Sequence, residues 1–143
     1  MAGPAAALPA TGYSATPLVR KLGIGANATV VVRHAPEGYD GLLAPLPAGV
    51  VFATDVSAST DLVHVFVDCK ATLERELAGL RPAIRGNAAV WVSWPKQSSR
   101  LPTDLTEDVV RACALPLGFV DVKVCAVTAV WSGLKLVIRK ALR

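Results

Sequence analysis

The clearest hydrophobic pattern in the chain lies between residues 61 and 94. Residues 62–67 and 88–94 are apolar runs rich in β-branched side chains, which is typical of strands that are buried on both faces. Between them, four apolar residues recur at helical spacing: Leu73, Leu77, Leu80 and Ile84. A helix of this length between two such strands predicts a right-handed crossover that joins parallel neighbours.

Strand patterns recur on both sides of this unit. Four segments carry them: residues 28–33, 50–52, 119–127 and 134–139. In the third segment, alternation predicts that Asp121 and Lys123 share one face of the sheet, opposite the face of three valines. These valines are Val120, Val122 and Val124. The connection between the last two segments is too short for a crossover and predicts an antiparallel hairpin.

Capping signals predict three further helical segments. Residues 16–23 begin with a Thr-Pro pair and end at a glycine, as a short helix does. Residues 40–44 have room for one helical turn before a proline. Asp104 and Glu107 form a variant of the capping box, which predicts that a helix begins there.

Together these elements predict one α/β domain: a Rossmann-like three-layer sandwich with a mixed sheet and an antiparallel C-terminal hairpin. The length of 143 residues suits a single domain, which we assign to residues 13–143 after an Ala/Pro-rich tail at residues 1–12. A hydrophobic content of 52% and a charged content of 18% favour a packed core over a disordered chain.

Composition also limits the partners that we expect. No apolar run is long enough to cross a bilayer, and no charge precedes Arg20, so we expect no membrane contact and a cytoplasmic location. The three cysteines include no C-x-x-C pair, which argues against a metal site or a disulfide framework. The net charge of +4 is spread along the chain rather than concentrated on one element, and we therefore do not expect nucleic-acid binding.

Ligands of open α/β sheets bind outside the carboxyl ends of the strands. The side chains that the pattern places at that edge, and that we predict to bind a ligand, are Arg33, His34, Tyr39, Asp68, Trp94, Lys96, Ser98, Ser99 and Arg100. The loop at residues 95–100 combines two cations, two hydroxyls and an amide ahead of a helix, which suits a phosphate or a carboxylate. The alternative is an ordinary solvated loop. His64, in the middle of a strand, fits a core histidine bonded to a backbone carbonyl, and no catalytic set is present.

One run of residues resembles a known family. Leu80-Arg81-Pro82, ahead of a strand that follows a glycine turn, is similar to the L-[KR]-P-G-G run of class I methyltransferases, whose sheet also ends in a reversed hairpin. More narrowly, the chain resembles a bacterial family of small, degenerate methyltransferase-like domains of unknown function. The segments that carry this resemblance include residues 13–14, 16–18, 21–24, 35–39, 91–96, 98–99, 103–107, 120–127 and 131–137.

The resemblance implies S-adenosylmethionine as the cofactor of true methyltransferases, held by a glycine-rich turn after the first strand. The corresponding turn here is residues 34–38, which holds one glycine, and Pro36 removes a backbone donor. We therefore expect no cofactor and interpret the chain as a non-catalytic module that binds a small anionic ligand or a protein partner, with regulation as one option for its role. The alternative is a divergent S-adenosylmethionine-dependent methyltransferase.

Overall fold

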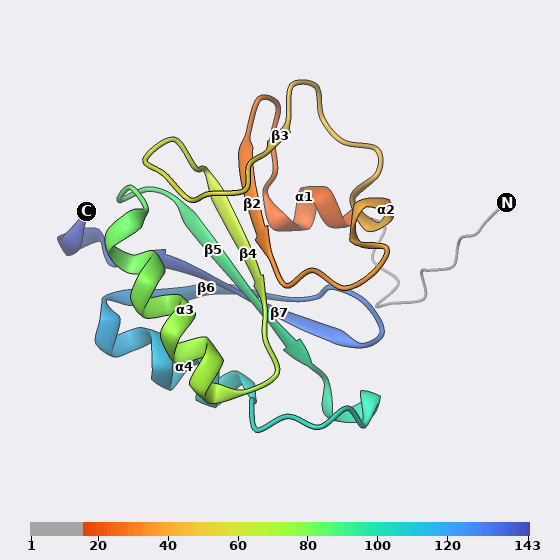
Figure 1. Cartoon of the computed structure of the whole chain (residues 1–143), viewed down its shortest axis with the longest axis vertical. Helices are drawn as coiled ribbons and strands as arrows, with labels where there is room; N and C mark the ends of the chain where they lie inside the picture. The colour runs from red at the N-terminus through yellow and green to blue at the C-terminus, as the bar shows by residue number, and fades with distance from the viewer. Residues whose placement is uncertain (1–15) are drawn as a thin grey trace, which may run out of the picture.

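The computed structural model describes residues 16–143, and its centre is a mixed sheet of six strands in the order β3-β2-β4-β5-β7-β6 (Figure 1). The strands are β2 (Thr29–Arg33), β3 (Val51–Phe52), β4 (Leu62–Phe66), β5 (Ala89–Pro95), β6 (Phe119–Ala126) and β7 (Trp131–Ile138). The first four strands of the sheet order are parallel, and β7 is antiparallel to both β5 and β6. The tail predicted at residues 1–12 lies outside the described residues.

Helices cover both faces of this sheet and complete the three layers (Figure 1). One face packs against α3 (Lys70–Ala83) and α4 (Glu107–Ala114), and the other packs against α1 (Leu18–Leu22) and α2 (Tyr39–Leu43). Single 3-10 turns form η1 (Gln97–Ser99), η2 (Leu115–Leu117) and η3 (Lys140–Leu142). This mixed sheet with helices on both faces confirms the predicted fold class.

None of the described helices is long and apolar enough to span a membrane.

The unit β4-α3-β5 forms the middle of the core, as the hydrophobic pattern predicts. All five residues of β4 are buried, and Leu73, Leu77 and Leu80 of α3 are at most 1% exposed. Each leucine buried in this way contributes roughly 1.5–3 kcal/mol relative to an exposed one. The parallel pairing of β4 with β5 makes α3 the predicted crossover helix.

The start of α4 differs from the prediction. Thr106, not Asp104, is the N-cap residue, and its side chain accepts a hydrogen bond from the Val109 N–H at 3.2 Å. Asp104 Oδ1 accepts instead from the N–H of Lys70 at 2.8 Å, at the beginning of α3. The capping-box prediction for Asp104 is wrong because this carboxylate lies near the starts of two helices and accepts from the free backbone N–H of α3 rather than that of α4.

The predicted alternation in β6 is also wrong, because the strand contains a bulge. Asp121 pairs with Leu136 and Lys123 with the adjacent Lys135, so the intervening Val122 has no partner in β7. The extra residue reverses the alternation. Asp121 accepts a hydrogen bond from Arg111 of α4, whereas Lys123 reaches α1 on the opposite face.

Candidate functional site

The end of β2 and the residue after it are fixed to α3 by one carboxylate. Arg33 Nη1 donates to Glu76 Oε1 at 2.9 Å, and His34 Nε2 lies 3.1 Å from Glu76 Oε2. Burial alone would raise the pKa of Glu76, but hydrogen bonds with His34 and Arg33 outweigh it and hold the pKa below its usual value. Glu76 is therefore a carboxylate that ties the end of β2 to the crossover helix.

The turn after β2 has an unusual backbone at its first residue. His34 has a φ of 60°, in the left-handed region that favours glycine, and Gly38 at the end of the turn has a φ of 84°. The contact between His34 and Glu76 holds the histidine in this conformation. The imidazole of His34, rather than bare backbone, thus faces the crevice where β2 ends.

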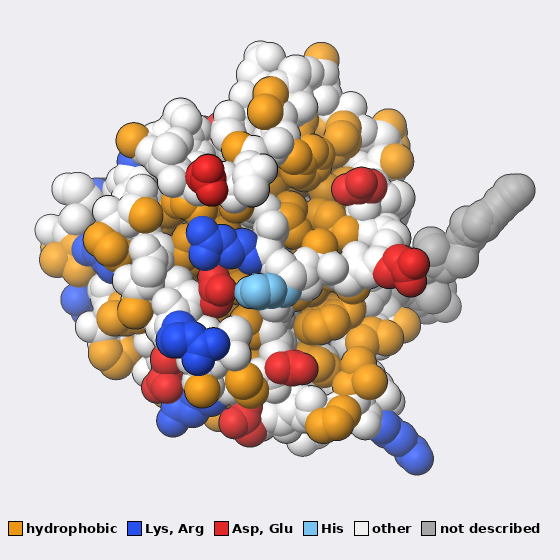
Figure 2. Space-filling view, in the orientation of Figure 1, with side chains coloured by type: hydrophobic (Ala, Val, Ile, Leu, Met, Phe, Trp, Pro, Cys, Tyr) orange, Lys and Arg blue, Asp and Glu red, His pale blue; other side chains and the backbone are white. Residues whose placement is uncertain are grey.

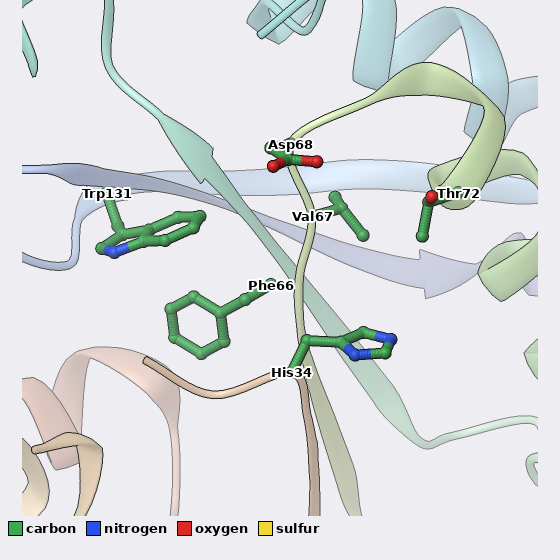
Figure 3. A pocket seen from close by; sticks show the side chains of 6 residues that line it. All are labelled: His34, Phe66, Val67, Asp68, Thr72 and Trp131. Carbon is green, nitrogen blue, oxygen red and sulfur yellow. The ribbon is translucent and has the colours of Figure 1, made fainter. Parts of the chain in front are cut away.

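A hollow of about 260 Å³ lies over the end of β4. It is lined by His34, Phe66, Val67, Asp68, Thr72 and Trp131. In the close view, the rings of Phe66 and Trp131 lie on one side of the chain leaving β4, and His34 and Thr72 lie on the other (Figure 3). The two rings meet edge to face with their centroids 5.1 Å apart, so one wall of the pocket is aromatic.

Asp68 is the charged group that the pocket offers to a ligand. Its side chain is exposed and takes part in none of the ion pairs between described residues. His34 is already paired with Glu76, and the Thr72 hydroxyl lies 3.1 Å from Cys69 Sγ. The surrounding face mixes acidic and basic side chains rather than gathering one sign (Figure 2). The pocket therefore favours a ligand with a positive charge or with N–H donors.

A buried chain of hydrogen bonds supports the aromatic wall. Tyr39 Oη lies 2.7 Å from His64 Nδ1, and His64 Nε2 lies 2.8 Å from Ser93 Oγ. The Phe66 ring stacks on the His64 ring with a centroid distance of 4.3 Å. His64 is completely buried, as expected for a core histidine, but its partners are two hydroxyls and not the predicted backbone carbonyl. Burial lowers the pKa of His64 to about 3, so the ring is neutral.

The structure brings only some of the predicted ligand-binding residues together. His34 and Asp68 line the pocket, and Arg33 lies beside it through Glu76. Tyr39 is 4% exposed and acts behind the wall, where burial and then Asp40 raise the pKa of its hydroxyl. Trp94 is 5% exposed and belongs to the core beneath α3 and α4, so it does not line the pocket.

The predicted binding loop lies apart from the pocket. Ser98 and Ser99 lie in η1, Lys96 and Arg100 flank it, and none of the four lines the hollow at the end of β4. Ser99 Oγ donates to the carbonyl of Lys96 at 2.6 Å and accepts from the N–H of Leu101 at 3.2 Å. This hydroxyl therefore closes its own turn.

Sequence reasoning did not assign Glu76, Phe66, Thr72 or Trp131 to a ligand site. A signal exists for Glu76, which stands one residue before Leu77 and so borders the buried stripe of α3. Phe66 is two residues after His64 and shares its face of the sheet. Trp131 reaches the pocket through the pairing of β7 with β5, which sequence spacing does not reveal.

Metal chemistry has no support among the described residues. No group of three or more His, Cys, Asp or Glu side chains in residues 16–143 could hold a metal ion. The three cysteines are free, and burial raises the pKa of both Cys113 and Cys125.

Comparison with known proteins shows the fold and no family. No family model matches the chain, and no curated protein matches it. Among solved structures, a SAM-dependent methyltransferase from Aquifex aeolicus is 12% identical, with 85% of this chain and 87% of that chain covered and a TM-score of 0.60. A ribosomal protein L11 methylase from Lactobacillus delbrueckii subsp. bulgaricus is 10% identical, with coverage of 85% and 74% and a TM-score of 0.53.

A possible exported protein from Bordetella parapertussis is 11% identical, with a TM-score of 0.61. The match covers 84% of this chain but only 64% of the Bordetella chain, so this protein spans less than two thirds of that relative. At such identities the likeness establishes a class I methyltransferase-like, Rossmann-like fold.

Proposed function

We propose that the protein is a binding module that holds a small, flat, nitrogen-containing ligand in the pocket at the end of β4 and transfers no group. The observation that carries this proposal is the pocket itself. Phe66 and Trp131 form an aromatic wall, and Asp68 supplies a carboxylate that is in no ion pair with another described residue. Flat rings pack against aromatic faces and edges, cations are attracted to the faces, and a carboxylate accepts hydrogen bonds from N–H groups.

The volume and the walls argue for a small ligand over S-adenosylmethionine. The hollow of about 260 Å³ is below the roughly 300–1,000 Å³ of most small-molecule sites. His34 stands at the turn where the methyltransferase resemblance implies glycine, and its imidazole is held by Glu76. Pro36 in the same turn has no N–H to offer. These residues do not fit the whole cofactor.

The charge of the pocket also differs from the anionic ligand expected from the loop at residues 95–100. Asp68 is negative, and the charge of Arg33 is matched by that of Glu76. A ligand with a positive or N–H-bearing edge therefore suits the pocket better than a phosphate does.

Two ring compounds of similar shape and opposite charge test the proposal. Benzamidine should quench the fluorescence of Trp131 saturably, whereas benzoate should not, because only benzamidine complements Asp68. The quenching should disappear in the Trp131→Phe variant, since Trp91 and Trp94 are at most 5% exposed. Asp68→Asn should weaken benzamidine binding by about tenfold, the loss expected when a charge-assisted hydrogen bond becomes neutral.

The control variant is Asp55→Asn, which removes an exposed carboxylate from the loop after β3 and should leave binding unchanged. Equal binding of benzamidine and benzoate, or no binding of either, would contradict the proposal.

The likeness to solved methyltransferases favours a second candidate, a divergent S-adenosylmethionine-dependent methyltransferase. Calorimetric titration with S-adenosylmethionine separates the two. Saturable binding at micromolar concentration, abolished by Asp68→Asn, would favour this candidate and rule out the small-ligand module.

A further inference from the structure

The β6–β7 hairpin places like charges directly opposite each other. Lys123 of β6 is the register partner of Lys135 of β7, on the face of the sheet that carries α1. Directly opposed side chains in an antiparallel pair have Cβ atoms about 4.5–5.5 Å apart, and like charges at that separation are destabilising. Such a pair requires an explanation beyond the stability of the sheet.

A third lysine joins them from α1. Lys123 Nζ donates to the carbonyl of Lys21 at 3.3 Å, and Lys135 Nζ lies beside Gly23, where α1 ends. Lys21 and Lys123 are both near enough to Cys125 to lower its pKa, although the burial that raises it dominates. Lys21, Lys123 and Lys135 thus form one cluster, called here the hairpin lysine cluster.

No carboxylate balances this cluster among the described residues. All six ion pairs of residues 16–143 use Arg33, His34, Arg85 or Arg111 and none uses a lysine. The carbonyl of Lys21 carries a partial negative charge and offsets part of one ammonium group. The cluster therefore retains nearly three positive charges on one side of the hairpin.

The bulge at Val122 creates this arrangement. Regular alternation would put Asp121 on the same face as Lys123, where its carboxylate could neutralise the cluster. The bulge instead sends Asp121 to Arg111 on the other face and leaves Val122 and Val124 53% and 51% exposed. Bulges protect edge strands from pairing, but that role does not require opposed lysines. Bulges also re-aim side chains at functional sites, and this role explains both the bulge and the opposed lysines.

We propose that the hairpin lysine cluster is a binding site for a small oligophosphate anion. Three compact ammonium groups match the charge of a pyrophosphate group, and phosphate oxygens accept hydrogen bonds from several donors at once. A polymer is less suited, because nucleic-acid binding uses more phosphate contacts together with interleaved aromatic side chains, and β6 has no aromatic residue after the buried Phe119. The site is separate from the pocket at Asp68 and does not depend on the function proposed for it.

Titration of the full chain with pyrophosphate, followed by calorimetry at low salt, tests the site. We expect saturable binding that weakens as salt is added, because salt screens the attraction of charges that are exposed or only half-buried. The double variant Lys123→Gln, Lys135→Gln should bind at least tenfold more weakly. The matched control Lys140→Gln removes the same charge from η3 and should bind within twofold of the wild type.

Thermal unfolding without ligand distinguishes this role from simple capping of α1. If the lysines are opposed in order to hold an anion, Lys123→Gln relieves repulsion and raises Tm by roughly 1–3 °C at low salt. If Lys123 serves only to cap α1 through the carbonyl of Lys21, the same substitution lowers Tm.

Three binding results would overturn the proposal, in addition to a lowered Tm of Lys123→Gln. The first is no saturable heat with pyrophosphate, and the second is equal affinity in the wild type and the double variant. The third is retention on phosphatidylserine vesicles that pyrophosphate does not compete with, which would assign the cluster to a membrane surface.

Discussion

The buried neutral His64 should make the protein lose stability in mildly acidic solution. Burial lowers its pKa from 6.5 to about 3 in the folded state, whereas the unfolded chain exposes an ordinary imidazole. The unfolded state therefore binds a proton first as the pH falls. The stability due to neutral His64 is complete above about pH 7 and is lost progressively as the pH falls from about 6.5 to 3.

The magnitude follows from these two pKa values. Between pH 7.5 and pH 5 the unfolded state gains about 2 kcal/mol from protonation of this imidazole, and the folded state gains almost nothing. The comparison stops at pH 5 because Glu76 and the other carboxylates with lowered pKa values exchange protons mainly below that point. A loss of about 2 kcal/mol is a large part of the roughly 5–15 kcal/mol by which domains are stable.

Urea denaturation at pH 7.5 and pH 5 measures this difference directly. His64→Gln keeps a donor and an acceptor between Tyr39 and Ser93 but cannot titrate, so its free energy of unfolding should change by less than about 0.5 kcal/mol between the two pH values. His34→Gln, at the exposed histidine, should keep most of the wild-type difference. An unchanged wild-type stability, or the same pH difference in His64→Gln, would refute the assignment of a neutral core histidine.

Four further substitutions have effects that denaturation can check. Tyr39→Phe removes the partner of His64 Nδ1 and should lower the free energy of unfolding by about 1–3 kcal/mol, because a buried polar atom is left unsatisfied. An unchanged free energy of unfolding would show that water replaces the hydroxyl. Gly79→Ala, in α3 with open space around the new Cβ, should raise the free energy of unfolding by about 0.5–1 kcal/mol. Gly133→Ala should lower it by about 1–3 kcal/mol, since the new Cβ would lie 2.9 Å from a side-chain atom. Thr106→Ala should cost about 1 kcal/mol through loss of the α4 cap, and no cost would contradict the observed N-cap.

Hydrophobic periodicity predicted the centre of this fold because only one arrangement of the segments there buries their apolar side chains. The strand at residues 62–67 is apolar on both faces, so it belongs inside a parallel sheet, and the leucine spacing of α3 permits a single buried stripe. The hairpin was predicted from a short connection. Its bulge was not, because Val120 to Val124 alternate perfectly in the sequence and the register shift depends on the partner strand.

Only those residues of the candidate site that stand near strand ends could be predicted from the sequence. His34 directly follows β2 and Asp68 stands two residues after β4, and parallel strands end at one edge, so both reach the pocket. Trp94 also stands near a strand end, but its parity along β5 turns it into the core beneath α3. The loop at residues 95–100 does not line the pocket, because β5 continues to Pro95, farther along the sheet than β2 and β4.

The aromatic wall of the pocket is supported from the α1 and α2 side of the sheet. α2 has five residues, and none of them lines the pocket. Tyr39 at the start of α2 is buried, and burial obliges its hydroxyl to find a partner, which is His64. His64 in turn stacks on Phe66 and fixes the ring that forms the pocket wall. The buried polar chain therefore serves the site indirectly, because it holds rigid the aromatic surface against which a flat ligand would bind.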